Sequence, residues 1–211
     1  MIEDSKMDIK NYLYSISKKD SNILDMLENY IVNQYRGRSY HNLSHINSCL
    51  KEFNEYIDYA ENNGLEPLHS KSIVFAILYH DIIMCTEQNE HLSAERAYLD
   101  GMLLGLPEDL LNIAYKCIIA TKHDSIPVNS FEKIMIDVDL SILGQSESIY
   151  KDYTLNIRLE YSHIPASIFY PKRKEILSNF LNRSSIFTLD YFKDKYEKAA
   201  RYNIASEING Y

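Results

Sequence analysis

Apolar residues recur every three or four positions along most of the chain, which is the spacing of amphipathic α-helices. No alternating run bounded by turn residues is long enough to indicate a strand. The segments predicted to be helical are residues 23–37, 42–64, 70–84, 92–104, 107–121, 131–143, 146–163, 170–181 and 189–208. The 6 glycines and 5 prolines fall mostly between these segments. The pattern therefore predicts an all-α fold, a single-domain helical bundle spanning residues 1–211.

The segment 70–84 is apolar nearly all round, which places it in the middle of the bundle. It contains the sequence Tyr79-His80-Asp81 near its carboxyl end. Burying an unpaired charge costs free energy, so a His-Asp pair after so apolar a run needs a partner. A metal ion supplies one. Imidazole and carboxylate ligands suit Mn²⁺, Fe²⁺, Co²⁺, Ni²⁺ or Mg²⁺ better than a metal that prefers thiolates.

Two further segments contain histidine or aspartate residues, the same types as in the His-Asp pair. One is Tyr-His-Asn-Leu-Ser-His, ending at His45, and the other is Asp-Val-Asp-Leu-Ser, beginning at Asp137. His41 and His45 are four positions apart, so they share one face if a single helix includes both. Asn42 or Ser44 is the expected N-cap of that helix.

Together these residues resemble the HD superfamily of metal-dependent phosphohydrolases, whose pattern is a histidine, a His-Asp pair and a distant aspartate. His45, His80, Asp81 and Asp139 fit that pattern in order and would be the metal ligands. The first segment is also similar to the start of the catalytic domain of cyclic-nucleotide phosphodiesterases. By that similarity His41 would be the proton donor and His45 a ligand.

The Asp-Leu-Ser triplet, which those enzymes share, favours Asp139 over Asp137 as the last ligand. Asp137 is then expected to orient a ligand histidine. The phosphodiesterases are longer and have an extended purine-binding region that this chain lacks. A cyclic-nucleotide substrate is therefore not implied.

The resemblance is closer to a bacterial subgroup described as predicted HD phosphohydrolases, and it covers most of the chain, with a motif core at about residues 38–161. The further matching segments are residues 35–40, 89–90, 93–94, 120–123, 157–161 and 169–173. The resemblance implies hydrolysis of a small phosphate ester or nucleotide by metal-activated water. It does not identify the substrate.

Other residues have both a functional and a structural interpretation. His123 is a ligand of a second metal, a donor that faces the substrate, or a cation at a helix C-terminus. Glu90 orients or deprotonates the attacking water, or it is an ordinary first-turn glutamate. Arg38, Lys122 and Arg158 are candidates to hold phosphate oxygens, or else surface charges.

Two other functions remain open at this stage. One is a catalytically silent domain that binds a nucleotide or a metal for sensing. The other is oxidative chemistry at a two-iron site, as in some HD relatives, which needs more histidine ligands than the motifs supply.

The amino-acid composition indicates which classes of binding partner to expect. The 211 residues include 22 Lys and Arg against 30 Asp and Glu, a net charge of −8, which argues against binding a nucleic-acid duplex. A local cationic site for a small phosphorylated substrate is compatible with that charge. A soluble cytoplasmic protein is favoured by three features of the sequence. Its three cysteines include no Cys-x-x-Cys pair, it has no apolar leader, and it has no run of about 20 apolar residues. The oligomeric state is left open.

Overall fold

The structure is a computed structural model that describes residues 8–64, 69–84 and 87–210. Within these residues every regular element is helical, which confirms the all-α prediction. The chain divides into two compact units. The first comprises the residues up to Gly37 together with His41–Ile136, and the second comprises Arg38–Tyr40 and the residues from Asp137 onward. A single domain over residues 1–211 stays a prediction, because each unit is described by itself.

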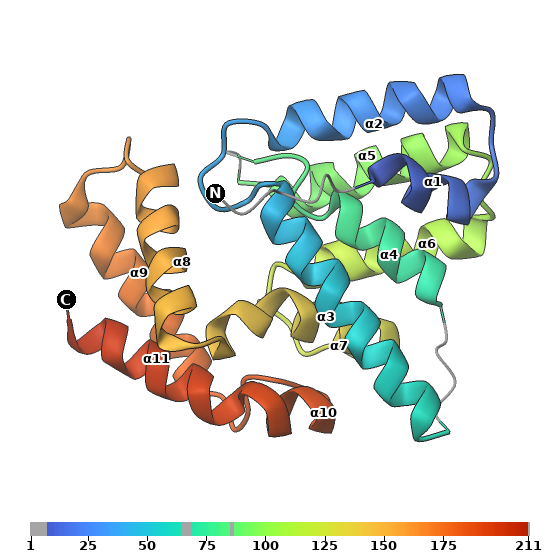
Figure 1. Cartoon of the computed structure of the whole chain (residues 1–211). Coiled ribbons are helices and arrows are strands. Elements are labelled where there is room, and N and C mark those ends of the chain that lie inside the picture. The colour runs from blue at the N-terminus through green and yellow to red at the C-terminus, as the bar shows by residue number, and fades with distance from the viewer. Residues whose placement is uncertain (1–7, 65–68, 85–86, 211) are drawn as a thin grey trace. The chain divides into compact units, whose positions relative to one another are not determined.

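The first unit is built around one apolar helix, as the sequence predicts. Its helices are α1 (Ile9–Ser17), α2 (Ser21–Tyr35), α3 (Leu43–Asn62), α4 (Ser70–Tyr79), α5 (Asn89–Leu103), α6 (Glu108–Ala120) and the first part of α7 (Ser130–Leu140). Helix α4 contacts α1, α3, α5 and α6, and it lies among them in Figure 1. Ile73, Phe75, Ile77 and Leu78 on α4 are fully buried. Each such side chain stabilises the fold by about 1.5–3 kcal/mol.

Local signals explain where α3 begins. The side chain of Asn42 accepts hydrogen bonds from the backbone N–H groups of Ser44 and His45, at 2.8 and 3.3 Å. This confirms Asn42 as the N-cap and leaves His41 outside the helix.

Helix α1, which the apolar spacing does not predict, is short and buries only Ile9, Leu13 and Ile16.

Helix α4 ends at Tyr79, five residues before the predicted end at residue 84. His80 still has helical dihedral angles and donates its backbone N–H to Ala76, but the following residues form a turn. The His-Asp pair therefore lies where the central helix gives way to a turn. This exit brings the two side chains to the edge of the apolar core.

The second unit contains the end of α7, a 3₁₀ turn (Ser141–Gly144) and helices α8 (Glu147–Glu160), α9 (Ala166–Leu181), α10 (Asp190–Phe192) and α11 (Lys198–Asn209), with a π-helical turn (Lys193–Glu197) before α11. The buried guanidinium of Arg173 on α9 donates to Glu207 on α11 at 2.9 Å and to the Tyr153 hydroxyl on α8 at 3.0 Å. These bonds join three helices (Figure 1).

Helix α9 begins at Ala166, four residues before the predicted start at residue 170. Pro165 provides a non-helical N-cap there, and Pro171 lies inside the helix rather than in its first turn. In the described parts of the chain, no helix is both long and apolar enough to cross a bilayer.

Candidate metal centre

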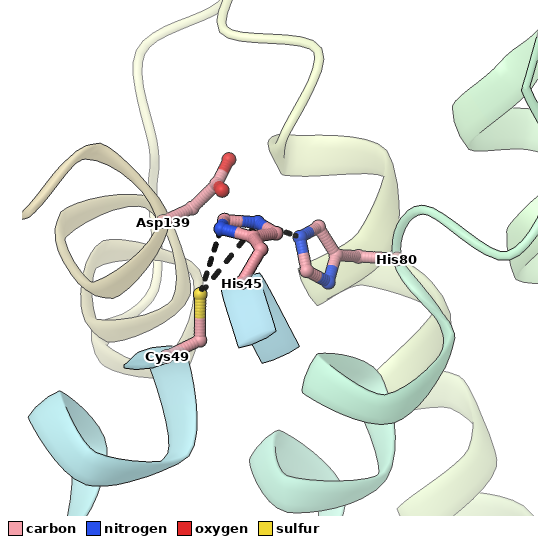
Figure 2. Close-up of side chains that lie close together, drawn as sticks. All are labelled: His45, Cys49, His80 and Asp139. Atoms are coloured by element: carbon pink, nitrogen blue, oxygen red, sulfur yellow. Dashed lines mark hydrogen bonds between the residues drawn. The ribbon is translucent and has the colours of Figure 1, made fainter. Parts of the chain in front are cut away.

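Two histidines and a cysteine of the first unit meet beside the end of α4. His45 and Cys49 lie one turn apart on α3, and His80 follows the last residue of α4 (Figure 2). Their exposed fractions are 7%, 2% and 1%. One nitrogen or sulfur atom from each lies within 4.8 Å of the others, so the group could hold a metal ion.

The hydrogen bonding of His80 determines which of its ring nitrogens can bind a metal. Its Nδ1 lies 2.9 Å from the carbonyl oxygen of Ile77. A carbonyl oxygen only accepts, so Nδ1 carries the proton and Nε2 is left with its lone pair in the neutral ring. A backbone carbonyl on the second nitrogen is the usual way in which a protein orients a metal-binding histidine.

Asp81 adds a third donor beside the two histidines. Its Oδ2 lies 3.0 Å from His80 Nε2 and 3.4 Å from His45 Nε2, and the two Nε2 atoms are 3.1 Å apart. An ion bonded to N and O ligands at about 2.1 Å separates neighbouring ligand atoms by about 3.0 Å in octahedral geometry and about 3.4 Å in tetrahedral geometry. The three atoms therefore already have the spacing of ligands around one ion.

These three atoms also need a positive charge between them. His80 Nε2, in the neutral ring, and the Asp81 carboxylate are both acceptors, and at 3.0 Å they repel unless a proton or a cation lies between them. A divalent cation satisfies all three atoms at once. The donor set therefore fits a metal ion by distance and by charge.

The electrostatics of Asp81 favour its ionised form. Burial by itself would raise the pKa of this carboxyl group. When no metal is bound and the rings are protonated, the charges of His80 and His41, with hydrogen bonds from His45 and His80, outweigh burial and hold the pKa of Asp81 well below its usual range. A carboxylate that stays ionised is ready to bind a cation at neutral pH.

Sequence reasoning missed Cys49 as a possible ligand. The available signal was its position four residues after His45 on a predicted helix, which places the two side chains on one face. Its Sγ lies 3.7 Å from His45 Nε2 and 3.8 Å from His45 Nδ1. Because these distances are nearly equal, the sulfur packs against the imidazole ring rather than along the lone pair of either nitrogen.

We therefore expect Cys49→Ala to bind a divalent ion about as tightly as the unmodified protein, within about tenfold. The reason is that the sulfur would have to rotate away from the ring to reach an ion on His45 Nε2. Calorimetric titration with Co²⁺ and the absorption spectrum of the Co²⁺ form measure this. A thiolate-to-cobalt charge-transfer band that disappears in Cys49→Ala would instead make Cys49 a ligand and favour softer metals.

His41 lies next to this group without belonging to α3. Its ring centroid is 5.9 Å from that of His45, with the two rings nearly perpendicular. His41 is half-buried, and its charge contributes to the low pKa of Asp81. The structure thus brings together four of the predicted site residues, His41, His45, His80 and Asp81.

Asp137 and Asp139 belong to the second unit, on the last turn of α7. Figure 2 draws Asp139 with the other candidate ligands. Asp137 was expected to orient a histidine, but its carboxylate accepts from the backbone N–H groups of Thr188 and Leu189 and from the Thr188 hydroxyl, at 2.7–3.0 Å. Burial raises its pKa to about 6 although these donors lower it. Asp137 therefore ties α7 to the segment that enters α10.

Three other predicted site residues lie around the ends of α5 and α6. Glu90 occupies the first turn of α5 and is half-buried. Lys122 follows α6 and pairs with the exposed Asp124 at 2.7 Å, and the hydrogen bond with Asp124 raises the pKa of Lys122. His123 has a left-handed backbone (φ 58°) and donates its N–H to Ala120. The catalytic role of Glu90 and the metal and phosphate roles of His123 and Lys122 stay predictions.

The two predicted arginines belong to the second unit. Arg38 is half-buried in the short Arg38–Tyr40 segment. Arg158 donates to the carbonyl oxygens of Tyr161 and Ile164, at 2.7 and 3.1 Å. Its guanidinium therefore caps the end of α8, a structural role that the sequence interpretation did not include. Phosphate binding by either arginine stays a prediction.

Cys49 and Cys117 carry free thiols, whereas Cys85 lies outside the described residues.

Searches of protein-family models, curated proteins and solved structures found no match to this chain. The resemblance to HD phosphohydrolases therefore rests on the motif residues alone. Over the residues that it describes, the structure establishes an all-helical fold with a group of side chains that could hold a metal.

Proposed function

We propose that this protein is a metal-dependent phosphohydrolase of the HD type that acts on a small phosphate ester or nucleotide. The observation that supports it most is the convergence of His45 Nε2, His80 Nε2 and Asp81 Oδ2, at 3.0–3.4 Å from one another. The order of these residues along the chain, with His41 before them, is that of the HD pattern.

Asp139 is the proposed fourth ligand. Helix α7 runs without a break from Ser130 to Leu140, so Asp139 lies less than one turn beyond Ile136, the last residue that α7 contributes to the first unit. The HD pattern ends with an aspartate at this place in the order, which is the reason for proposing Asp139. With Asp139 the set has two imidazoles and two carboxylates, which suits Mn²⁺, Fe²⁺, Co²⁺, Ni²⁺ or Mg²⁺.

A bound divalent ion would lower the pKa of a water molecule and polarise a phosphoryl oxygen. His41 would protonate the leaving oxygen of the substrate, because it lies beside the donor set while remaining partly accessible to solvent. His80 would stay in one tautomer through its Nδ1–H bond to Ile77. Arg38, Lys122 and Arg158 are the cationic residues proposed to hold phosphate oxygens, and His123 the ligand proposed for a second ion.

A substrate panel tests this function. The protein is stripped with a chelator, reloaded with Mn²⁺ or Co²⁺, and assayed on phosphomonoesters, phosphodiesters and nucleoside phosphates. We expect one class to be hydrolysed only by the reloaded protein. Tight metal or nucleotide binding without turnover of any class would contradict catalysis and support a sensing role.

A further inference from the structure

Helix α5 forms hydrogen bonds with the chain immediately before and after the His80–Asp81 turn. Ser93 and Asp100 lie two turns apart on α5 and are buried, with exposed fractions of 0% and 5%. Ser93 contacts the chain after the turn, at Ile83, and Asp100 contacts the chain before it, at Tyr79. We call these two contacts the α5 clamp.

The contact after the turn is a backbone hydrogen bond. The N–H of Ile83 donates to the Ser93 hydroxyl at 3.1 Å, and that hydroxyl lies 3.5 Å from the carbonyl oxygen of the same residue. Ile83 is two positions after Asp81. Ser93 therefore fixes the path that the backbone takes as it leaves the turn.

The contact before the turn is a buried hydroxyl–carboxylate bond. The Tyr79 hydroxyl donates to Asp100 Oδ2 at 3.0 Å, and Arg96 donates to the same oxygen at 2.8 Å. The guanidinium of Arg96 in turn lies 3.7 Å from the ring centroid of Tyr30 on α2.

These contacts matter because His80 and Asp81 lie past the end of α4. Residues within a helix are positioned by the helix itself, whereas residues in a turn depend on what holds the flanking chain. Metal ligands must keep their geometry to a fraction of an ångström, and loss of a supporting partner typically weakens metal binding by about 10–100-fold.

We propose that Ser93 and Asp100 are positioning residues that set the geometry of His80 and Asp81 for metal binding. This inference rests on the proposed function, since it requires that the centre binds an ion. It assigns to α5 a role that neither the motif pattern nor the group of possible ligands includes.

The test compares Ser93→Ala and Tyr79→Phe with the unmodified protein. Each change removes one oxygen atom and no metal ligand. Tyr150→Phe is the matched control, because it also removes a buried tyrosine hydroxyl that donates to a carboxylate, Glu207, in the second unit. The measurements are the Co²⁺ dissociation constant, the visible spectrum of the Co²⁺ form and the melting temperature of the metal-free protein.

We expect Ser93→Ala and Tyr79→Phe each to weaken Co²⁺ binding by about 10–100-fold and to change the cobalt spectrum. Tyr150→Phe should lower the melting temperature without changing either metal readout. If both α5-clamp variants keep the Co²⁺ affinity and the cobalt spectrum of the unmodified protein, the inference is overturned while the proposed function stays intact. Failure of the unmodified protein to bind Co²⁺ would overturn both.

Discussion

Replacing His80 or Asp81 by alanine is expected to abolish both metal retention and hydrolysis. His80 supplies a buried lone pair fixed by the Ile77 carbonyl, and Asp81 supplies the carboxylate that lies within 3.4 Å of both histidines. Losing one of these donors leaves only two of the three converging atoms to bind the ion. Because loss of a supporting partner alone costs about 10–100-fold in affinity, loss of a ligand should cost more than about 100-fold.

Elemental analysis of dialysed protein and calorimetric titration with Mn²⁺ or Co²⁺ measure this effect. His91→Ala is a suitable control, because His91 is an exposed histidine of the same unit that contacts Tyr115 and matches no motif. The control should keep the metal content of the unmodified protein. Unchanged metal content in both His80→Ala and Asp81→Ala would remove them from the ligand set.

His41→Ala is expected to keep its metal and to lose most of its turnover. His41 lies outside α3, next to the His45 ring but not among the three converging donor atoms. Removing it should therefore leave metal stoichiometry unchanged while the leaving oxygen loses its proton donor. A positioned general acid typically contributes about 10²–10⁴-fold, and we expect a decrease in kcat of that size.

The leaving group distinguishes this role from a general loss of structure. An ester whose leaving group departs readily as an anion needs no proton, so His41→Ala should impair its hydrolysis much less than that of an alkyl ester. Metal content, measured on the same samples, should match the unmodified protein. Equal impairment with both kinds of ester would contradict a proton-donating role.

Most helices were predictable because their signals are local. Helix α3 begins after its asparagine cap, and α2 ends two residues before Gly37, as apolar spacing and capping rules predict. The central position of α4 followed from its apolar surface on all sides. The prediction of its end was wrong, since Ile82, Ile83 and Met84 continue the apolar pattern while Ser93, on another helix, holds the chain in a turn.

The site was predictable to the extent that its chemistry is visible in adjacent residues. His80 and Asp81 stand out because a polar pair follows a buried run, and His41 and His45 because they form a motif. Cys49 was missed although its position one turn after His45 on a predicted helix was a signal for it.

Other roles depend on contacts between residues distant in sequence, which apolar spacing does not report. Asp137 ties α7 to the chain entering α10, and Asp100 supports Tyr79 from α5. From the sequence, Asp137 was interpreted as a residue that orients a ligand histidine, because its partners near α10 were not known.

The metal content of the purified protein shows whether His45, His80 and Asp81 bind an ion. The protein is purified, dialysed against Mn²⁺, Co²⁺ or Fe²⁺, freed of unbound ions and analysed for metal per chain, beside His80→Ala. We expect one tightly held ion per chain, or two if His123 binds a second, and none in His80→Ala. Less than about 0.1 ion per chain in the unmodified protein with every metal would contradict a metal centre at His45, His80 and Asp81.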